Sequence, residues 1–163
     1  MFGTIVVASN GSETADRALA AAECLAHEVS SRVVLAHIIE VMMRRGFAHP
    51  VNPSEDWLLT KLRLQVAGMQ AAGVNAELET RTTPGEPTRV LADIAEACDA
   101  DLIVTGGGRR NLIGEFVLGS VGRRPPRLAS CPVLVIPPTR RRQAPGPSEV
   151  VRPREDAVAS WQR

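Results

Sequence analysis

Residues 85–106, GEPTRVLADIAEACDADLIVTG, place a turn, a helix and a strand in direct succession. Pro87 suits the first position of a helix, where its missing N–H would have no partner in any case. The apolar residues that follow recur at helical spacing and give this helix a core face: Val90, Leu91, Ile94, Ala95 and Cys98. Asp101–Thr105 then predicts a strand, and Gly106 begins a glycine-rich loop. This succession is typical of α/β folds.

The alternation of strands and helices extends in both directions along the chain. Short apolar, β-branched runs predict buried strands, and a weakly alternating run predicts an edge strand. In chain order the predicted strands are Thr4–Ser9, Arg32–Ile39, Val74–Thr82 (the edge strand), Asp101–Thr105 and Cys131–Ile136. Helical stripes of apolar residues follow Ser12 and Ser54, whereas residues 40–53 predict a loop because they contain a glycine and two prolines. The fold class is therefore α/β, a doubly wound, mostly parallel five-stranded sheet flanked by helices on both faces.

Length and composition indicate one domain and a tail. We predict an α/β domain over residues 1–138 and a disordered tail over 139–163, where prolines and arginines are interspersed with small residues. Lys and Arg number 19 and Asp and Glu 18, and the resulting net charge of +1 gives no field that would attract nucleic acid. The N-terminus starts in a strand pattern without a signal peptide, and no apolar run is long enough to span a membrane.

The three cysteines show neither a metal-binding nor a C-x-x-C spacing. Cys24 and Cys98 fall on apolar faces of predicted helices, so we expect them to be small core residues. Without a signal peptide, a membrane span or such a spacing, a reducing cytosol is the default compartment. We therefore expect a cytoplasmic protein with no nucleic-acid and no membrane partner.

Three segments of the chain resemble the universal stress protein family. They are IVVASNGSE at 5–13, GEPTRVLADIAEACDADLIVTG at 85–106 and SCPVLVIP at 130–137. Their order and spacing are specific, and the resemblance covers most of residues 1–137. It implies the adenine nucleotide alpha hydrolase-like fold, with five strands in the order 3-2-1-4-5. Strands one and four are then neighbours at the topological switch point, where sheets of this kind bind ligands.

Nucleotide-binding members of that family carry the motif G-x2-G-x9-G-[S/T] between the fourth strand and the fourth helix. Gly106 matches its first glycine and Gly119-Ser120 matches its last pair, whereas Arg109 replaces the second glycine. The family also often has an acidic residue at the end of the first strand, where this chain has Asn10. If Ser120 caps the fourth helix, the prolines at 125 and 126 split or restart that helix.

A glycine-rich loop that leads into a helix can bind phosphate, because its backbone N–H groups converge and the helix dipole favours negative charge. The candidate nucleotide-binding residues are Ala8, Asn10, Ile38, Thr105, Gly106, Arg109, Gly119, Ser120 and Val121. These candidate residues also have purely structural explanations. The glycines can form a tight turn, Asn10 can close an Asx turn, and Ala8 and Ile38, which match the family's adenine contacts, can be core residues. Arg109 either bonds phosphates through its guanidinium, fills their space, or is a solvated loop residue.

The sequence shows no arrangement of catalytic residues and no set of metal ligands beside these candidates. The histidines are scattered, and His37, late in a buried strand, is better explained as a satisfied core histidine than as a base. The glycine-rich loop lacks the G-K-[S/T] ending of a P-loop. We therefore expect a non-enzymatic stress-response protein that binds ATP or AMP. The alternative is a dimeric interaction module of the same fold without a cofactor; a nucleotide hydrolase would need a catalytic loop that we do not find.

The strand Cys131–Ile136 points to self-association. In the order 3-2-1-4-5 it lies at one edge of the sheet, and it is short, apolar and uncharged. An uncovered edge of this kind invites pairing with another strand. Proteins of the family that this chain resembles often dimerise through this strand. We expect a homodimer through Cys131–Ile136, and a regulatory protein partner that the sequence does not identify.

Overall fold

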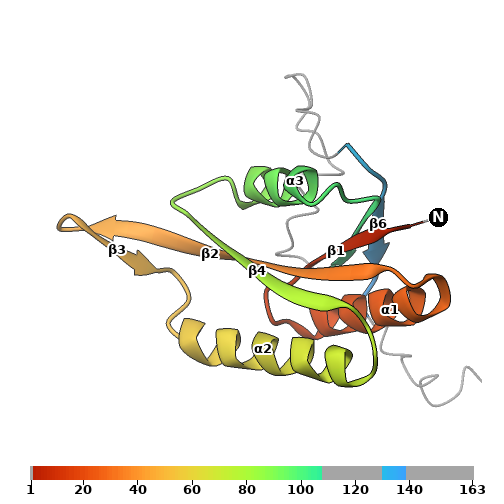
Figure 1. Cartoon of the computed structure of the whole chain (residues 1–163). Coiled ribbons are helices and arrows are strands. Elements are labelled where there is room, and N and C mark those ends of the chain that lie inside the picture. The colour runs from red at the N-terminus through yellow and green to blue at the C-terminus, as the bar shows by residue number, and fades with distance from the viewer. Residues whose placement is uncertain (1, 108–129, 139–163) are drawn as a thin grey trace, which may run out of the picture.

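The computed structural model describes residues 2–107 and 130–138. The predicted fourth helix, the second half of the glycine-rich motif and the predicted tail over 139–163 lie outside these residues. The described part contains three helices and six strands, coloured in chain order in Figure 1.

Five parallel strands form the main sheet. They are β1 (Thr4–Ala8), β2 (Arg32–Arg44), β4 (Ala76–Thr83), β5 (Leu102–Gly106) and β6 (Val133–Ile136). The strands lie side by side in the order β4-β2-β1-β5-β6. This confirms the predicted order, because β4 is the third, β5 the fourth and β6 the fifth of the predicted strands. Among the described residues β4 pairs only with β2, as expected for an edge strand.

Helices cover both faces of the sheet (Figure 1). α1 (Glu13–Val29) and α2 (Glu55–Ala71) lie on one face, and α3 (Pro87–Ala97) lies on the other. Successive strand residues alternate between the two layers. On the side of α1 and α2 the strands contribute Ile5, Val7, Val33, Leu35, Leu102 and Val104. On the side of α3 they contribute Val6, Ala8, Val34, Ala36 and Ile103. The continuous apolar runs in the sequence reflect burial on both faces.

The local signals at the helix ends act largely as predicted. Ser12 caps α1, because its hydroxyl accepts a hydrogen bond from the N–H of Ala15 at 3.3 Å. Pro87 occupies the start of α3, and Gly73 follows α2 with a φ of 86°. The prediction for Cys24 was wrong, because this side chain is exposed. The core stripe of α1 consists of small residues and one leucine instead: Ala15, Ala18, Leu19, Ala22 and Ala26.

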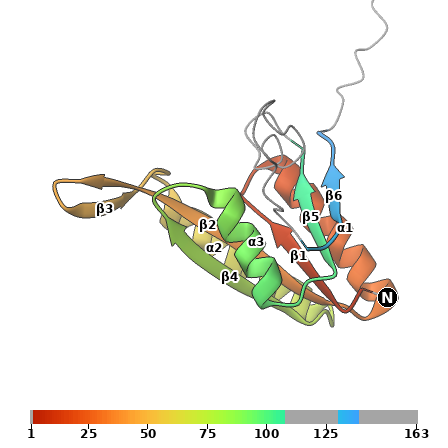
Figure 2. The same ribbon diagram turned by 90° about the horizontal axis from the view of Figure 1, so that it is seen from above.

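The loop predicted over residues 40–53 is in part a β-hairpin. β2 continues to Arg44, and β3 (Phe47–Pro50) returns antiparallel to it. Arg45 and Gly46 form the two-residue connection with φ values of 49° and 82°, as a type I′ turn requires. The hairpin projects from the body of the domain (Figure 2).

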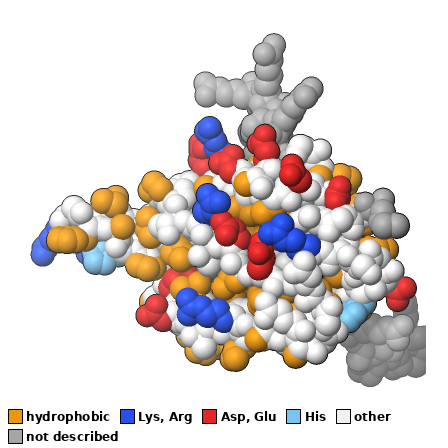
Figure 3. All heavy atoms as spheres, viewed as in Figure 1, with side chains coloured by type: hydrophobic (Ala, Val, Ile, Leu, Met, Phe, Trp, Pro, Cys, Tyr) orange, Lys and Arg blue, Asp and Glu red, His pale blue; other side chains and the backbone are white. Residues whose placement is uncertain are grey.

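Large apolar side chains are exposed on and beside this hairpin: Met42, Met43, Phe47 and Val51. Figure 3 shows hydrophobic side chains along the projecting hairpin, whereas acidic and basic side chains are interspersed on the same face of the main body. The interspersed charges agree with the predicted lack of a strong field. Among the described residues, no helix is long and apolar enough to cross a membrane.

A carboxylate joins the amino ends of the two central strands. Asp101 accepts hydrogen bonds from the backbone N–H groups of Gly3 at 2.7 Å and Thr4 at 3.0 Å. These bonds, with that from Thr4 the stronger influence, hold the pKa of Asp101 below its usual value. A lowered pKa in the folded state means that this contribution to stability is present at neutral pH and is lost as the pH falls through that pKa.

Candidate functional site

The candidate site lies where β1 and β5 end beside the middle of β2, which itself continues to Arg44. β1 is the central strand, and its last residue, Ala8, is opposite Ala36 of β2 and Thr105 of β5. The chain leaves β1 toward α1 and returns through β2 on one side, whereas β5 lies on the other side. This is the topological switch point that the predicted strand order implies.

Three predicted site residues come together on the α3 side of the sheet. Ala8 belongs to the core on that side, and Ile38 packs against it half-buried. Thr105 follows Ile103 of the same core by two residues, so its side chain lies on the same face. Ala8 and Thr105 are buried. The end of the sheet thus presents a methyl group, a branched aliphatic chain and one hydroxyl from three neighbouring strands.

The loop after β1 is a compact turn that leads into α1. The Ser9 N–H donates to the Ala36 carbonyl at 2.9 Å and extends the strand pairing by one residue. Asn10 is exposed, and its Oδ1 accepts from the Ser12 N–H at 3.2 Å. The Asx turn, one of the two explanations of Asn10, is therefore present. The hydroxyl of Ser9 accepts from the Gly11 N–H at 3.2 Å.

Gly106 has a packing role that the sequence did not reveal. A Cβ atom at this position would lie 2.5 Å from the backbone C and O atoms of Thr14, in the first turn of α1. Glycine is therefore required where β5 passes the start of α1, whether or not a phosphate approaches the same backbone. The next residue, Gly107, donates its N–H to the Ile136 carbonyl at 2.6 Å, so this donor takes part in sheet pairing.

The remaining candidates lie outside the described residues. They are Arg109, Gly119, Ser120 and Val121. The phosphate-binding half of the predicted site, including the two opposite roles of Arg109, therefore stays a prediction. Within residues 2–107 and 130–138, no group of three or more His, Cys, Asp or Glu side chains is arranged to hold a metal ion.

The structure adds a buried pair that the sequence did not predict. His37 and Glu55 are both buried, and the Nε2 of His37 lies 2.5 Å from Oε1 of Glu55. The Nδ1 of His37 lies 2.8 Å from the carbonyl oxygen of Ser9. His37 is thus the satisfied core histidine that was expected. Its carboxylate partner could not be named, because Glu55 stands on another element and resembles an ordinary acidic residue of a first helical turn.

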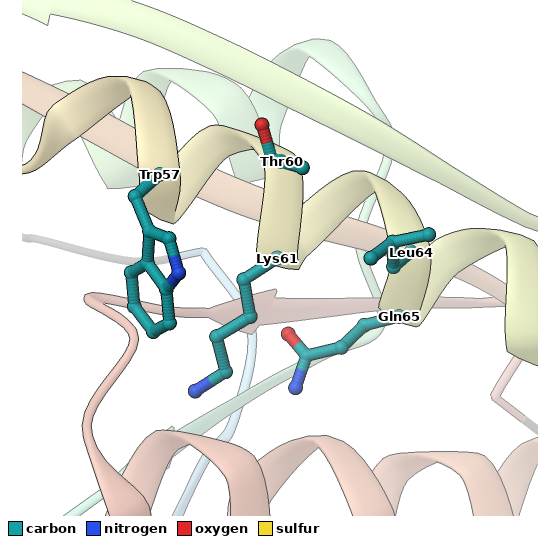
Figure 4. A pocket seen from close by; sticks show the side chains of 5 residues that line it. All are labelled: Trp57, Thr60, Lys61, Leu64 and Gln65. Atoms are coloured by element: carbon teal, nitrogen blue, oxygen red, sulfur yellow. The ribbon is translucent and has the colours of Figure 1, made fainter.

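A second set of polar contacts joins α2 to the same loop. The Nζ of Lys61 donates to the Gly11 carbonyl at 3.0 Å and to the Asp16 carboxylate at 2.8 Å. Gln65 donates to the other oxygen of Asp16 at 2.8 Å. Figure 4 shows Lys61 and Gln65 extending from α2 toward α1. With Trp57, Thr60 and Leu64 they line a shallow groove of about 390 Å³.

Comparison with known proteins agrees with this architecture. The model of the universal stress protein family matches residues 1–137. The universal stress protein Sll1388 of Synechocystis is 32% identical over 154 residues, which covers 83% of this chain and 97% of that protein. YxiE of Bacillus subtilis is 27% identical over 147 residues, which covers 83% of this chain and 99% of that protein.

Solved structures match over the same extent. A universal stress protein from Archaeoglobus fulgidus is 26% identical, with a TM-score of 0.59 over 83% of this chain and 99% of that one. An Archaeoglobus fulgidus structure in complex with dAMP is 23% identical, with a TM-score of 0.59 over 82% and 96%. An Arabidopsis thaliana family member with AMP bound is 20% identical, with a TM-score of 0.59 over 88% and 97%. At these last two identities the likeness shows the fold.

Proposed function

Because this chain belongs to the universal stress protein family, we propose that it binds an adenine nucleotide, AMP or ATP, and serves in a stress response without catalysing a reaction. The observation that carries the proposal is the convergence of Ala8, Ile38 and Thr105 on one face at the switch point, beside the loop of Asn10. Ligands of such sheets bind in this position.

The chemistry of these residues suits the base and sugar of a nucleotide. An adenine ring needs an apolar surface with a few polar groups at its edge, which aliphatic side chains and one hydroxyl supply. The exposed Asn10 lies next to this surface and can bond a ribose hydroxyl. The phosphates would meet the glycine-rich segment from Gly106 to Ser120, with Arg109 either bonding or obstructing them. The dAMP and AMP held by structures of the same fold support this choice of ligand.

Calorimetric titration with AMP and ATP tests the proposal. Ile38→Ala should weaken binding about tenfold, because a lost aliphatic contact of about 1.4 kcal/mol changes an affinity by that factor. Ile39→Ala is a matched control, since Ile39 is half-buried on the same strand but faces the opposite side of the sheet. Absence of binding to the wild type at millimolar nucleotide would refute the function. Equal weakening in both variants would refute the location.

We also propose that the protein is a homodimer through β6, the arrangement on which the alternative role as an interaction module depends. Among the described residues β6 pairs only with β5, so its other edge is open. It carries no charge, and Leu134 is 38% exposed. Antiparallel pairing of two such edges would satisfy the backbone groups in both copies.

Leu134→Lys should convert the dimer to a monomer, because it places a charge at the centre of the paired strands. Light scattering at tens of micromolar protein measures this change. Leu64→Lys makes the same substitution at an exposed leucine of α2 and should leave the dimer intact. A monomeric wild type, or a Leu134→Lys variant that stays dimeric, would contradict the assignment.

The cytoplasm is the compartment that we propose. All three cysteines are unpaired in the structure, and free thiols persist in a reducing environment.

A further inference from the structure

The inference concerns how the loop after β1 is held, and it rests on the nucleotide site proposed above. Two carbonyl groups of this loop accept bonds from the side of the sheet that α2 covers. The Ser9 carbonyl accepts from His37, and the Gly11 carbonyl accepts from Lys61. The proposed nucleotide lies toward the α3 side. The contacts that fix the loop therefore come from the α2 side, and they leave the α3 side of the loop to the ligand.

The direction of one peptide group follows from the His37 contact. In a trans peptide the C=O and the following N–H point in opposite directions, and the described residues contain no cis peptide. Turning the Ser9 carbonyl toward His37 therefore turns the N–H of Asn10 away from α2. Asn10 is the exposed residue of the proposed site. The orientation of its backbone donor is thus determined by a side chain on a neighbouring strand.

Glu55 in turn determines the orientation of the His37 ring. A carbonyl oxygen can only accept, so Nδ1 of His37 must donate to Ser9. The contact of 2.5 Å between Nε2 and Glu55 then joins two buried groups. The bond between Nε2 and Glu55 prevents the ring from rotating, in the way that carboxylates fix functional histidines elsewhere. Glu55 also begins α2, so the pair ties the start of this helix to the loop.

We propose that His37, held by Glu55, is a positioning residue for nucleotide binding: it sets the affinity by orienting the Ser9–Asn10 peptide and does not touch the ligand. The contact that matters is the one from Nδ1 to Ser9, whereas the contact from Nε2 to Glu55 matters more for the stability of the fold. The two functions of the ring can therefore be separated by substitution.

Two amide variants make this separation. In His37→Asn the amide nitrogen replaces Nδ1, so the donor to Ser9 is kept and the partner of Glu55 is lost. In His37→Gln the amide nitrogen replaces Nε2, so the opposite contact is kept. His37→Asn should bind AMP within about threefold of the wild type, and His37→Gln should bind at least tenfold more weakly. The unfolding midpoints should follow the reverse order, since His37→Asn leaves a buried carboxylate unpaired.

A merely structural role predicts that affinity and stability fall together in both variants. That result, or unchanged affinity in His37→Gln, would overturn the proposal. The amide signal of Asn10 in NMR spectra of the unliganded protein is a second readout. It should move in His37→Gln and hold its position in His37→Asn. If the wild type binds no AMP, the proposed function fails, and the amide signal alone then tests whether His37 orients the Ser9–Asn10 peptide.

Discussion

Leu62→Ala should lower the free energy of unfolding by about 3–4 kcal/mol, the range found for a leucine truncated in a closely packed core. Leu62 is completely buried, and it lies in the core layer between the sheet and the helices α1 and α2. The variant loses the transfer free energy of the removed atoms, and the surrounding side chains can only partly fill the space. A loss of this size is a large part of the stability of a single domain.

Leu64→Ala supplies the control for this substitution. Leu64 stands on the same helix, undergoes the same chemical change and is 68% exposed. Its truncation should change the free energy of unfolding by no more than about 0.5 kcal/mol. Urea denaturation of both variants measures the difference. Similar losses of unfolding free energy in the two variants would mean that α2 does not pack on the sheet through the face that carries Leu62.

Gly106→Ala should lower the free energy of unfolding by about 3 kcal/mol, at the upper end of the cost of overpacking. The added Cβ would lie within 2.8 Å of three atoms of Thr14, two of which belong to the backbone of α1. Backbone in the first turn of a capped helix cannot move aside as the end of a flexible side chain can. The start of α1 and the end of β5 must therefore separate, and the candidate site lies at this place.

Gly68→Ala is the matched control and should have the opposite sign. Gly68 lies inside α2, and a Cβ there would meet no atom within 4 Å. Alanine should stabilise the helix by about 1 kcal/mol. Thermal or urea unfolding distinguishes the two signs directly. If Gly106→Ala were as stable as the wild type, the close approach of β5 to α1 would be disproved, and Gly106 would be explained by ligand approach alone.

The sequence predicted the elements whose signals are local and repeated. The apolar runs of β1, β2 and β5 are buried on two faces, and no other element gives that pattern over so few residues. The hairpin after residue 40 was missed because residues such as Gly46 and Pro50 occur both in irregular loops and in tight hairpins. The hairpin depends on a left-handed backbone conformation at Arg45. Arginine rarely adopts this conformation, so the sequence gives no signal for it.

The candidate site was predictable as far as strand order and side-chain alternation determine it. Once β1 lies between β2 and β5, residues Ala8, Ile38 and Thr105 must meet on one face at one end of the sheet. Contacts between distant elements were beyond prediction. Nothing near His37 in the sequence marks Glu55 as its partner, and nothing near Gly106 shows that Thr14 will lie against it.

The central claim is that an adenine nucleotide binds where β1 and β5 end beside Ala36 and Ile38 of β2, on the α3 side of the sheet. Titration of the isotopically labelled protein with AMP, followed by amide chemical shifts in NMR spectra, tests it most directly. The account predicts saturable changes at Ala8, Asn10, Ile38 and Thr105. It also predicts little change at Trp57 and Leu64, which line the shallow groove on α2. No saturable change, or changes centred on Trp57 and Leu64, would contradict it.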